Sequence, residues 1–292
     1  MKEQSNGIEE MLIKRTGIFY LCLRRVPAMA AICLSAVFLM AQSNGITAKD
    51  AKAKEAVDAA QKALGGAGKI DGIKSLILSG TGTAAYDHFE FELRMLPPDN
   101  YFRFEKHFRT APTPSTRTIY SSVSKGEIIN LNIIDPTGSM NSAPKPIVSK
   151  DPDTINAQLG FMARLLIGTL MKAGPMPLTM SSGSIPDRFV ITTPSGVLCE
   201  IEFDAQSKYP SIIRYKQWLV TSHTPGGPWV PPTPNYEELE TVMRFSEWTA
   251  VDGIMFPRVV TYKADTIDRV MRFEKIQINP TLTMKDFEIP KQ

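Results

Sequence analysis

The chain has 292 residues, of which 43% are hydrophobic and 22% charged, enough for one large β-rich domain or two small ones. It carries 33 basic and 30 acidic residues; residues 1–43 hold five and three of them, which leaves 28 and 27 and a formal charge of +1 for the remainder. This balance argues against nucleic-acid binding, which requires a basic face, so we expect no nucleic-acid partner.

The N-terminal segment has the pattern of an export signal. Arg24-Arg25 supply the positive flank, Val26 to Met40 the apolar core, and Ala41-Gln42-Ser43 a small-residue cleavage site. We therefore predict a signal peptide over 1–43 and an exported, periplasmic protein, with an uncleaved membrane anchor as the second choice. The remainder, 44–292, is predicted to form a single domain.

The mature chain is predicted to begin with a helix from Thr47 to Leu64. Thr47 and Asp50 resemble a capping box, and Gly65-Gly66 end the helix. One more helical turn is expected in the segment that follows, before a strand over 75–85.

The next two segments alternate strictly between apolar and charged residues, which is typical of strands. Phe89, Phe91 and Leu93 fall on one face of the first, and Phe102 and Phe104 on one face of the second. Pairing of the two strands would bring these side chains together. They are interpreted either as an ordinary sheet core or as the lining of a lipid-sized cavity.

A second helix is predicted over 153–173, with apolar residues on nearly every side. Leu159, Met162 and Leu166 belong to its main stripe, and Arg164 is its only charge before Lys172. A helix of this kind must be enclosed by protein or lie in lipid. The run is too short, and Arg164 too central, for a membrane span.

The remaining segments read as strands separated by short turns, without βαβ alternation. One irregular piece, Thr221 to Asn235, contains five prolines, which we interpret as excluding helix and any central strand. Its Trp229 is apolar where a loop is normally polar, and is interpreted as packing on the domain or as part of a lip over a cavity mouth. The predicted fold is α+β: a curved antiparallel sheet, an unclosed barrel of about ten strands, with helices packed in or across its concave face.

Three pieces of the chain resemble a known family together: ALGGAGKIDGIKSL at Ala63–Leu76, VDGIMFP at Val251–Pro257, and FEKIQINPTL with DFEIP between Phe273 and Pro290. In that order they are similar to the periplasmic LolA/LolB-like superfamily of lipoprotein carriers, in its uncharacterised branch. The resemblance implies an unclosed barrel with helices in its mouth and an apolar cavity for acyl chains. The chain departs from the LolB pattern because it lacks a lipobox cysteine.

Motifs of catalysis are missing from the sequence. There is no Gly-x-Ser-x-Gly, no metal-type histidine pair and no glycine-rich phosphate loop, and Cys199 alternates with apolar residues as a buried strand residue does. We therefore predict no catalytic residues, no metal, no cofactor and no enzymatic activity.

The predicted function is a non-enzymatic periplasmic carrier or binding protein with an apolar cavity. Its expected partner is a lipid or acylated lipoprotein, with transient membrane contact; an envelope protein is a further partner under the alternative hypothesis, a sensor or protein-interaction module on the same fold. The residues predicted to line the cavity are Phe89, Phe91, Leu93, Phe102, Phe104, Leu159, Met162, Leu166 and Trp229.

Overall fold

The computed structural model describes residues 45–84, 87–99, 101–110, 115–124, 127–135, 146–174, 176–224, 233–264 and 267–288. The chain divides into two compact units, Met1–Ser43 and Asn44–Gln292, and the described residues all belong to the second. The predicted signal peptide and Trp229 lie outside the described residues, so both stay predictions.

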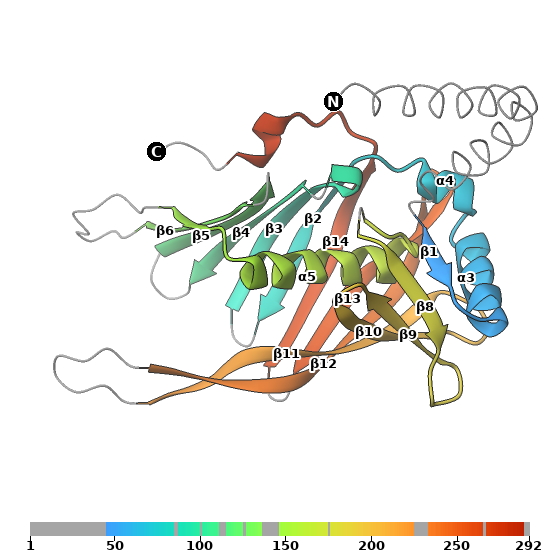
Figure 1. Ribbon diagram of the computed structural model, residues 1–292. Coiled ribbons are helices and arrows are strands. Elements are labelled where there is room, and N and C mark those ends of the chain that lie inside the picture. Colours follow the sequence, from blue (N-terminus) through green and yellow to red (C-terminus); the bar gives the residue numbers. More distant parts are fainter. Residues whose placement is uncertain are drawn as a thin grey trace, which may run out of the picture. The chain divides into compact units, whose positions relative to one another are not determined.

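The described residues form one 14-stranded sheet in the order β1-β8-β9-β10-β11-β12-β13-β14-β2-β3-β4-β5-β6-β7 (Figure 1). Its strands are β1 (Ile46–Ala48), β2 (Leu76–Ala84), β3 (Asp87–Leu96), β4 (Tyr101–Thr110), β5 (Ser115–Ser124), β6 (Glu127–Asp135), β7 (Ile147–Ser149), β8 (Leu178–Ser182), β9 (Arg188–Thr193), β10 (Gly196–Phe203), β11 (Pro210–Thr224), β12 (Thr233–Val251), β13 (Ile254–Ala264) and β14 (Ile267–Ile278). The helices are α3 (Ala51–Ala63), α4 (Ala67–Asp71) and α5 (Pro152–Leu170), with 3-10 turns η1 (Pro97–Asp99) and η2 (Met284–Phe287).

Every described strand pair is antiparallel except β1 with β8. The two ends of the strand order, β1 and β7, do not pair with each other, so the sheet is open. The prediction of an α+β fold with an unclosed antiparallel sheet is confirmed. The strands beyond those predicted are the short β1, β7 and β8.

Period-2 alternation separates an apolar inner face from a charged outer face. On β2, Leu76 and Leu78 point inward and are fully buried, and Gly82 has the same parity. Gly82 lies opposite Phe89, and a Cβ added to it would clash with the Phe89 ring. Glycine is therefore required here because the phenyl ring covers β2, and this contact fixes the position of Phe89 on the inner face.

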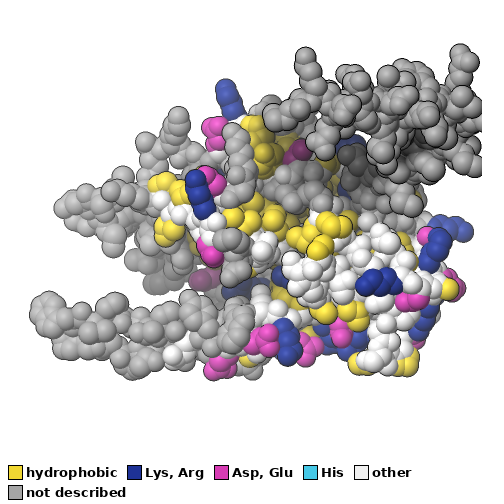
Figure 2. Space-filling model, viewed as in Figure 1, with side chains coloured by type: hydrophobic (Ala, Val, Ile, Leu, Met, Phe, Trp, Pro, Cys, Tyr) yellow, Lys and Arg dark blue, Asp and Glu magenta, His cyan; other side chains and the backbone are white. Residues whose placement is uncertain are grey.

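Helix α5 lies across the inner face of the sheet (Figure 1). Its C-terminal half is buried, with Leu165, Ile167 and Leu170 at 0% exposure, whereas Ile155 and Leu159 in the N-terminal half are only half-buried. In the same view, Figure 2 shows hydrophobic side chains gathered in the region of this helix. Among the described residues, no helix has the length and apolar character needed to cross a membrane.

The helix ends differ from those predicted. Helix α5 stops at Leu170, three residues early, because Met171 turns into the left-handed region at φ 49°. The first helix begins at Ala51 rather than Thr47, since Thr47 belongs to β1. Asp50 is its N-cap and accepts a hydrogen bond from the Ala53 N–H at 2.8 Å.

The proline-rich segment 221–235 was predicted wrongly in part. Strand β11 continues to Thr224 and β12 starts at Thr233, and these two residues are paired. Pro234 lies within β12 opposite His223. Pairing of β12 with β13 starts only at Val242, so this end of the β11–β12 hairpin is a two-stranded ribbon, and a ribbon tolerates a proline that a central strand excludes.

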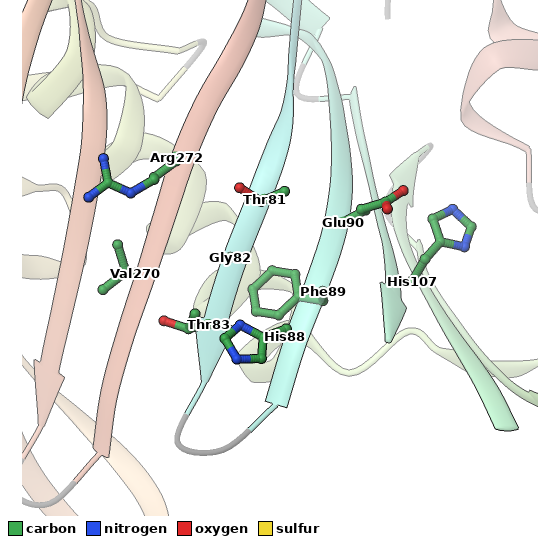
Figure 3. A pocket seen from close by; sticks show the side chains of 9 residues that line it. All are labelled: Thr81, Gly82, Thr83, His88, Phe89, Glu90, His107, Val270 and Arg272. Atoms are coloured by element: carbon green, nitrogen blue, oxygen red, sulfur yellow. The ribbon is translucent and has the colours of Figure 1, made fainter. Parts of the chain in front are cut away.

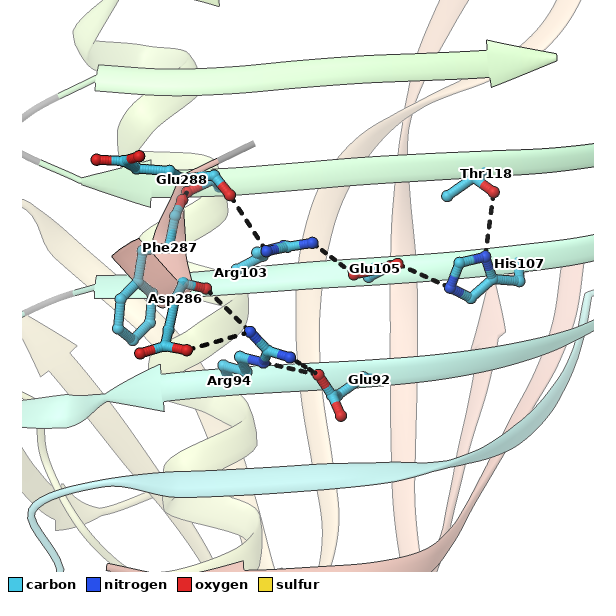
Figure 4. Close-up of polar contacts among 10 residues, drawn as sticks. Glu92, Arg94, Arg103, Glu105, His107, Thr118, Asp286, Phe287 and Glu288 are labelled. Atoms are coloured by element: carbon cyan, nitrogen blue, oxygen red, sulfur yellow. Dashed lines mark hydrogen bonds and ion pairs between the residues drawn. The ribbon is translucent and has the colours of Figure 1, made fainter. Parts of the chain in front are cut away.

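The C-terminal segment folds back over the outer face of β3, β4 and β5 (Figure 4). The side chain of Phe287 is 2% exposed, and its carbonyl oxygen accepts a hydrogen bond from Ser122 Oγ at 2.6 Å. Arg103 donates to the Glu288 carbonyl oxygen at 3.2 Å, and Arg94 lies 3.5 Å from the Asp286 carboxylate. Phe287 therefore anchors the C-terminal segment on the sheet.

Candidate functional site

The candidate site lies between the N-terminal half of α5 and the inner face of the sheet. Phe161, on α5, stacks against Phe104 of β4 with ring centroids 6.4 Å apart and planes 11° from parallel. Its other ring contact is Tyr262 of β13, at 6.1 Å and 25°. One helix residue is thus held between aromatic rings from strands on the two sides of the hollow.

A cavity of about 110 Å³ opens beside this stack. Phe89, Phe104, Phe161 and Tyr262 contribute to its walls, together with polar side chains that include Lys106. This volume is far below the roughly 300–1,000 Å³ of a small-molecule pocket.

The two charged side chains in the described wall of the cavity are both cations. Lys106 and Arg269 have the inward parity of Phe104 and Met271, and both line the cavity; Lys106 is half-buried and Arg269 exposed. The ammonium of Lys106 lies 4.4 Å from the Phe104 ring centroid and 5.6 Å from that of Phe89. Loss of hydration lowers the pKa of Lys106 to about 8, and the positive charge of Arg269 acts in the same direction.

Arg164 is a further cation that α5 and the sheet enclose. Its guanidinium lies 3.8 Å from the ring centroid of Tyr215, and Nη1 is 3.4 Å from the Leu198 carbonyl oxygen. Burial lowers the pKa of Arg164 and raises that of Tyr215. The cation is therefore held by neutral groups, a ring face and a carbonyl, which are weaker partners than a carboxylate.

Tyr262 adds an unpaired hydroxyl to the same wall. Its Oη is buried and has no hydrogen-bond partner among the described residues. Burial raises the pKa of Tyr262 well above its ordinary value, so the phenol keeps its proton and remains a hydrogen-bond donor. A buried hydroxyl of this kind costs free energy until a ligand or water accepts from it.

The predicted lining residues fall into separate groups. Phe89 and Phe104 line the cavity of about 110 Å³. A second, nearly filled gap of about 10 Å³ is lined by four others, namely Phe102, Leu159, Met162 and Leu166. Phe91 and Leu93, at 3% and 0% exposure, line neither space and lie within the core cluster, to which Phe89 and Phe104 also belong.

Sequence reasoning missed the four titratable members of the wall: Lys106, Tyr215, Tyr262 and Arg269. A signal for two of them exists. Lys106 continues the spacing of Phe102 and Phe104, and Arg269 precedes Met271 by two, so each places a cation on an apolar face. A charge at an inward-facing position costs free energy unless a partner offsets it, and is for that reason a marker of function.

The outer face carries a larger depression, of about 440 Å³, whose lining includes Thr81, His88, Glu90 and His107 (Figure 3). This depression is open to solvent. Within its lining, His107 Nε2 lies 2.8 Å from Glu105 Oε1 and His107 Nδ1 lies 3.1 Å from Thr118 Oγ1 (Figure 4). Within the described ranges, no cluster of three or more His, Cys, Asp or Glu side chains is placed to hold a metal ion.

Cys199 is a core residue. It is 1% exposed on β10, and burial raises the pKa of its thiol to about 12. A nucleophilic cysteine needs a lowered pKa and access to solvent, and Cys199 has neither. The prediction of a buried strand residue is confirmed.

Comparisons with known proteins give a distant likeness. No family model matches the chain, and no curated protein matches it. Among solved structures, a LolA superfamily protein from Nitrosomonas europaea is similar, with a TM-score of 0.40 and 12% sequence identity over 79% of this chain and 97% of that chain. At this identity the likeness concerns the fold alone and assigns no function.

Proposed function

We propose that this protein acts by binding rather than by catalysis, and that its ligand is a lipid or acylated molecule held between α5 and the inner face of the sheet. The predicted signal peptide over 1–43 supports a periplasmic location for that binding. The observation that carries the proposal is the contact of the N-terminal half of α5 with the sheet: an aromatic stack at Phe161 beside an incompletely filled, mostly apolar space.

Apolar contacts of this kind are exchangeable for contacts with a hydrocarbon chain. Each buried CH₂ contributes about 0.8 kcal/mol, so a chain that replaces Phe161 between Phe104 and Tyr262 recovers the burial lost when the helix moves. In its more specific form, the proposal is that the protein transfers an acylated lipoprotein. Such a carrier would contact the membrane transiently.

The test is binding of a neutral apolar dye, N-phenyl-1-naphthylamine, to delipidated protein expressed without residues 1–43. Saturable fluorescence gain, reversed by dodecanol, is the expected result. Ala264 lines the cavity and is 4% exposed, so Ala264→Leu should fill the space and abolish binding. Ala250→Leu, at an exposed position on β12, is the matched control and should bind as the parent does.

A third variant guards against misfolding. Phe161→Ala removes the ring that separates Phe104 from Tyr262 and should increase dye binding. Absence of saturable binding in both the parent and Phe161→Ala, with each folded by circular dichroism, would rule the proposal out.

A sensor or protein-interaction module on the same fold is the second candidate, and one observation favours it. The edge strand β7 exposes two large apolar side chains, Ile147 at 72% and Val148 at 51%. Exposed edge strands can pair with an added strand of a partner. A stoichiometric envelope protein captured by the parent but not by Val148→Lys, together with no dye binding, would favour this candidate.

A further inference from the structure

Three arginines of the outer face have carboxylate partners that the two cations of the cavity wall lack among the described residues. On the outer face, Arg94, Arg103 and Arg188 each pair with a carboxylate at 2.6 to 3.0 Å. On the inner face, neither Lys106 nor Arg269 belongs to any ion pair among the described residues. The described wall of the cavity holds these two cations and no carboxylate.

Such an arrangement is costly unless something offsets it. The ammonium of Lys106 is stacked on phenyl rings and its carrier strand faces the apolar hollow, where charge interactions are weakly screened. The Tyr262 hydroxyl, on the same wall, lacks an acceptor among the described residues. One anionic group placed there would satisfy the ammonium, the guanidinium of Arg269 and the hydroxyl together.

We propose that Lys106, Arg269 and Tyr262 bind the anionic head group of an amphiphile whose hydrocarbon chain lies under α5. This inference rests on the proposed function and adds the ligand class to it: an acyl chain that ends in a carboxylate or a phosphate. The polarity of the wall sets the orientation, with the head at Lys106 and the chain toward Phe104 and Phe161.

The experiment compares three ligands with the same chain: laurate, dodecyl phosphate and dodecanol. Affinities are measured by displacement of N-phenyl-1-naphthylamine from the mature protein at pH 7. Laurate or dodecyl phosphate should bind about tenfold or more tightly than dodecanol, since a charge-assisted contact in a poorly solvated site is worth at least that factor. The tighter of the two anions identifies the head group.

Variants assign the preference to the wall residues. Lys106→Met should cut the affinity for the preferred anion about tenfold and leave that for dodecanol unchanged, because the side-chain volume is retained while the charge is lost. Lys106→Arg should keep the preference. Lys263→Met is the matched control, since Lys263 is an exposed lysine of β13 with the opposite parity to Tyr262, and it should change neither affinity.

The outcomes separate the two proposals. Failure of all three ligands and of the dye to bind removes the proposed function itself. Equal affinity for anions and dodecanol, or an equal loss of both in Lys106→Met, leaves the apolar site standing and overturns the head-group assignment. Melting curves of each variant exclude unfolding as the cause of a loss.

Discussion

Two lysines lie beside α5 or its C-terminal end, and their surroundings are opposite. Lys172, just beyond the C-terminus of the helix, is 2% exposed and donates to the carbonyl oxygens of Ile70, Asp71 and Ile73 at 2.9, 3.2 and 3.0 Å. Lys106, in the wall of the cavity that Phe161 also lines, is half-buried and lies against phenyl rings, with no hydrogen-bond acceptor among the described residues. One ammonium is fully used by the fold, and the other is left to a ligand.

The contrast indicates how the helix is held. At the Lys172 end, backbone carbonyls of α4 and its C-terminal turn are tied to the end of α5, and the helix residues before it are fully buried. In the N-terminal half, α5 contacts the sheet through the rings around Phe161 and through Ile155 and Leu159, which pack against the core but are only half-buried. We infer a fixed C-terminal end and a displaceable N-terminal half.

The largest expected effect comes from truncating the same residue type in each half of α5. Leu166→Ala, at 2% exposure, should lower the free energy of unfolding by about 3 kcal/mol, because the tight end cannot collapse around the lost volume. Leu159→Ala, half-buried, should cost about 1 kcal/mol. Urea unfolding of both variants is the measurement; equal losses would contradict the division of the helix into two halves.

The next largest effect is expected at the two lysines. Lys172→Met removes three hydrogen bonds, and it leaves the buried carbonyl oxygen of Ile73 without another donor among the described residues, so it should destabilise the fold by about 2 kcal/mol. Lys106→Met removes a desolvated charge without stranding an acceptor, so its stability should equal or exceed that of the parent. Lys62→Met, at an exposed position on α3, serves as the control for both in thermal melts. A larger loss at Lys106 than at Lys172 would reverse the comparison.

The sequence could predict the features that depend on local patterns, but not those that depend on non-local pairing. Period-2 alternation was enough to place Phe89, Phe91 and Phe104 on the inner face, because a pleated strand leaves one choice of face. The short strands were out of reach, since β1 is three residues long and pairs with β8, whose first residue lies 132 positions from Ile46 in the register Ile46↔Leu178. Non-local pairing of that kind leaves no local pattern.

The polar part of the site was out of reach for a related reason. Lys106 and Arg269 come from β4 and β14, and only the order β14-β2-β3-β4 brings their strands to one face of one hollow. The aromatic partner of that wall, Phe161, comes from a helix whose placement no strand pattern specifies. The sequence alone marks Lys106 and Arg269 as unusual charges on apolar faces, but it does not predict which residues surround them.

A smaller effect is expected in hydrogen exchange along α5. Amides of residues 157–161 should exchange at least about tenfold faster than those of 166–170, because the N-terminal half can open without unfolding the sheet. Addition of dodecanol should change the exchange rates of the first group and leave those of the second unchanged. Exchange is measured by mass spectrometry on separate peptides from the N-terminal and C-terminal sides of Arg164. Equal protection of the two peptides would show that α5 moves as a unit or not at all.

The smallest effect is a pair of opposite pH responses at Lys106. Its pKa of about 8 in the folded protein lies below the ordinary 10.5, so between these values the unfolded chain binds more protons and the stability of the ligand-free protein rises with pH. Affinity for laurate should instead fall a few-fold from pH 7 to 9, since the ammonium that binds the carboxylate is lost.

The groups that face Lys106 across the cavity do not share this titration. Burial raises the pKa of both Tyr215 and Tyr262, which stay neutral up to pH 9, and Arg269 is the other charged group of the described wall. The response is therefore taken as the difference between the parent and Lys106→Met, in urea titrations for stability and in dye displacement for laurate. A lysine with only a structural role would make stability rise with pH but would not change the affinity for laurate. Both responses together therefore indicate that Lys106 binds the head group of a ligand.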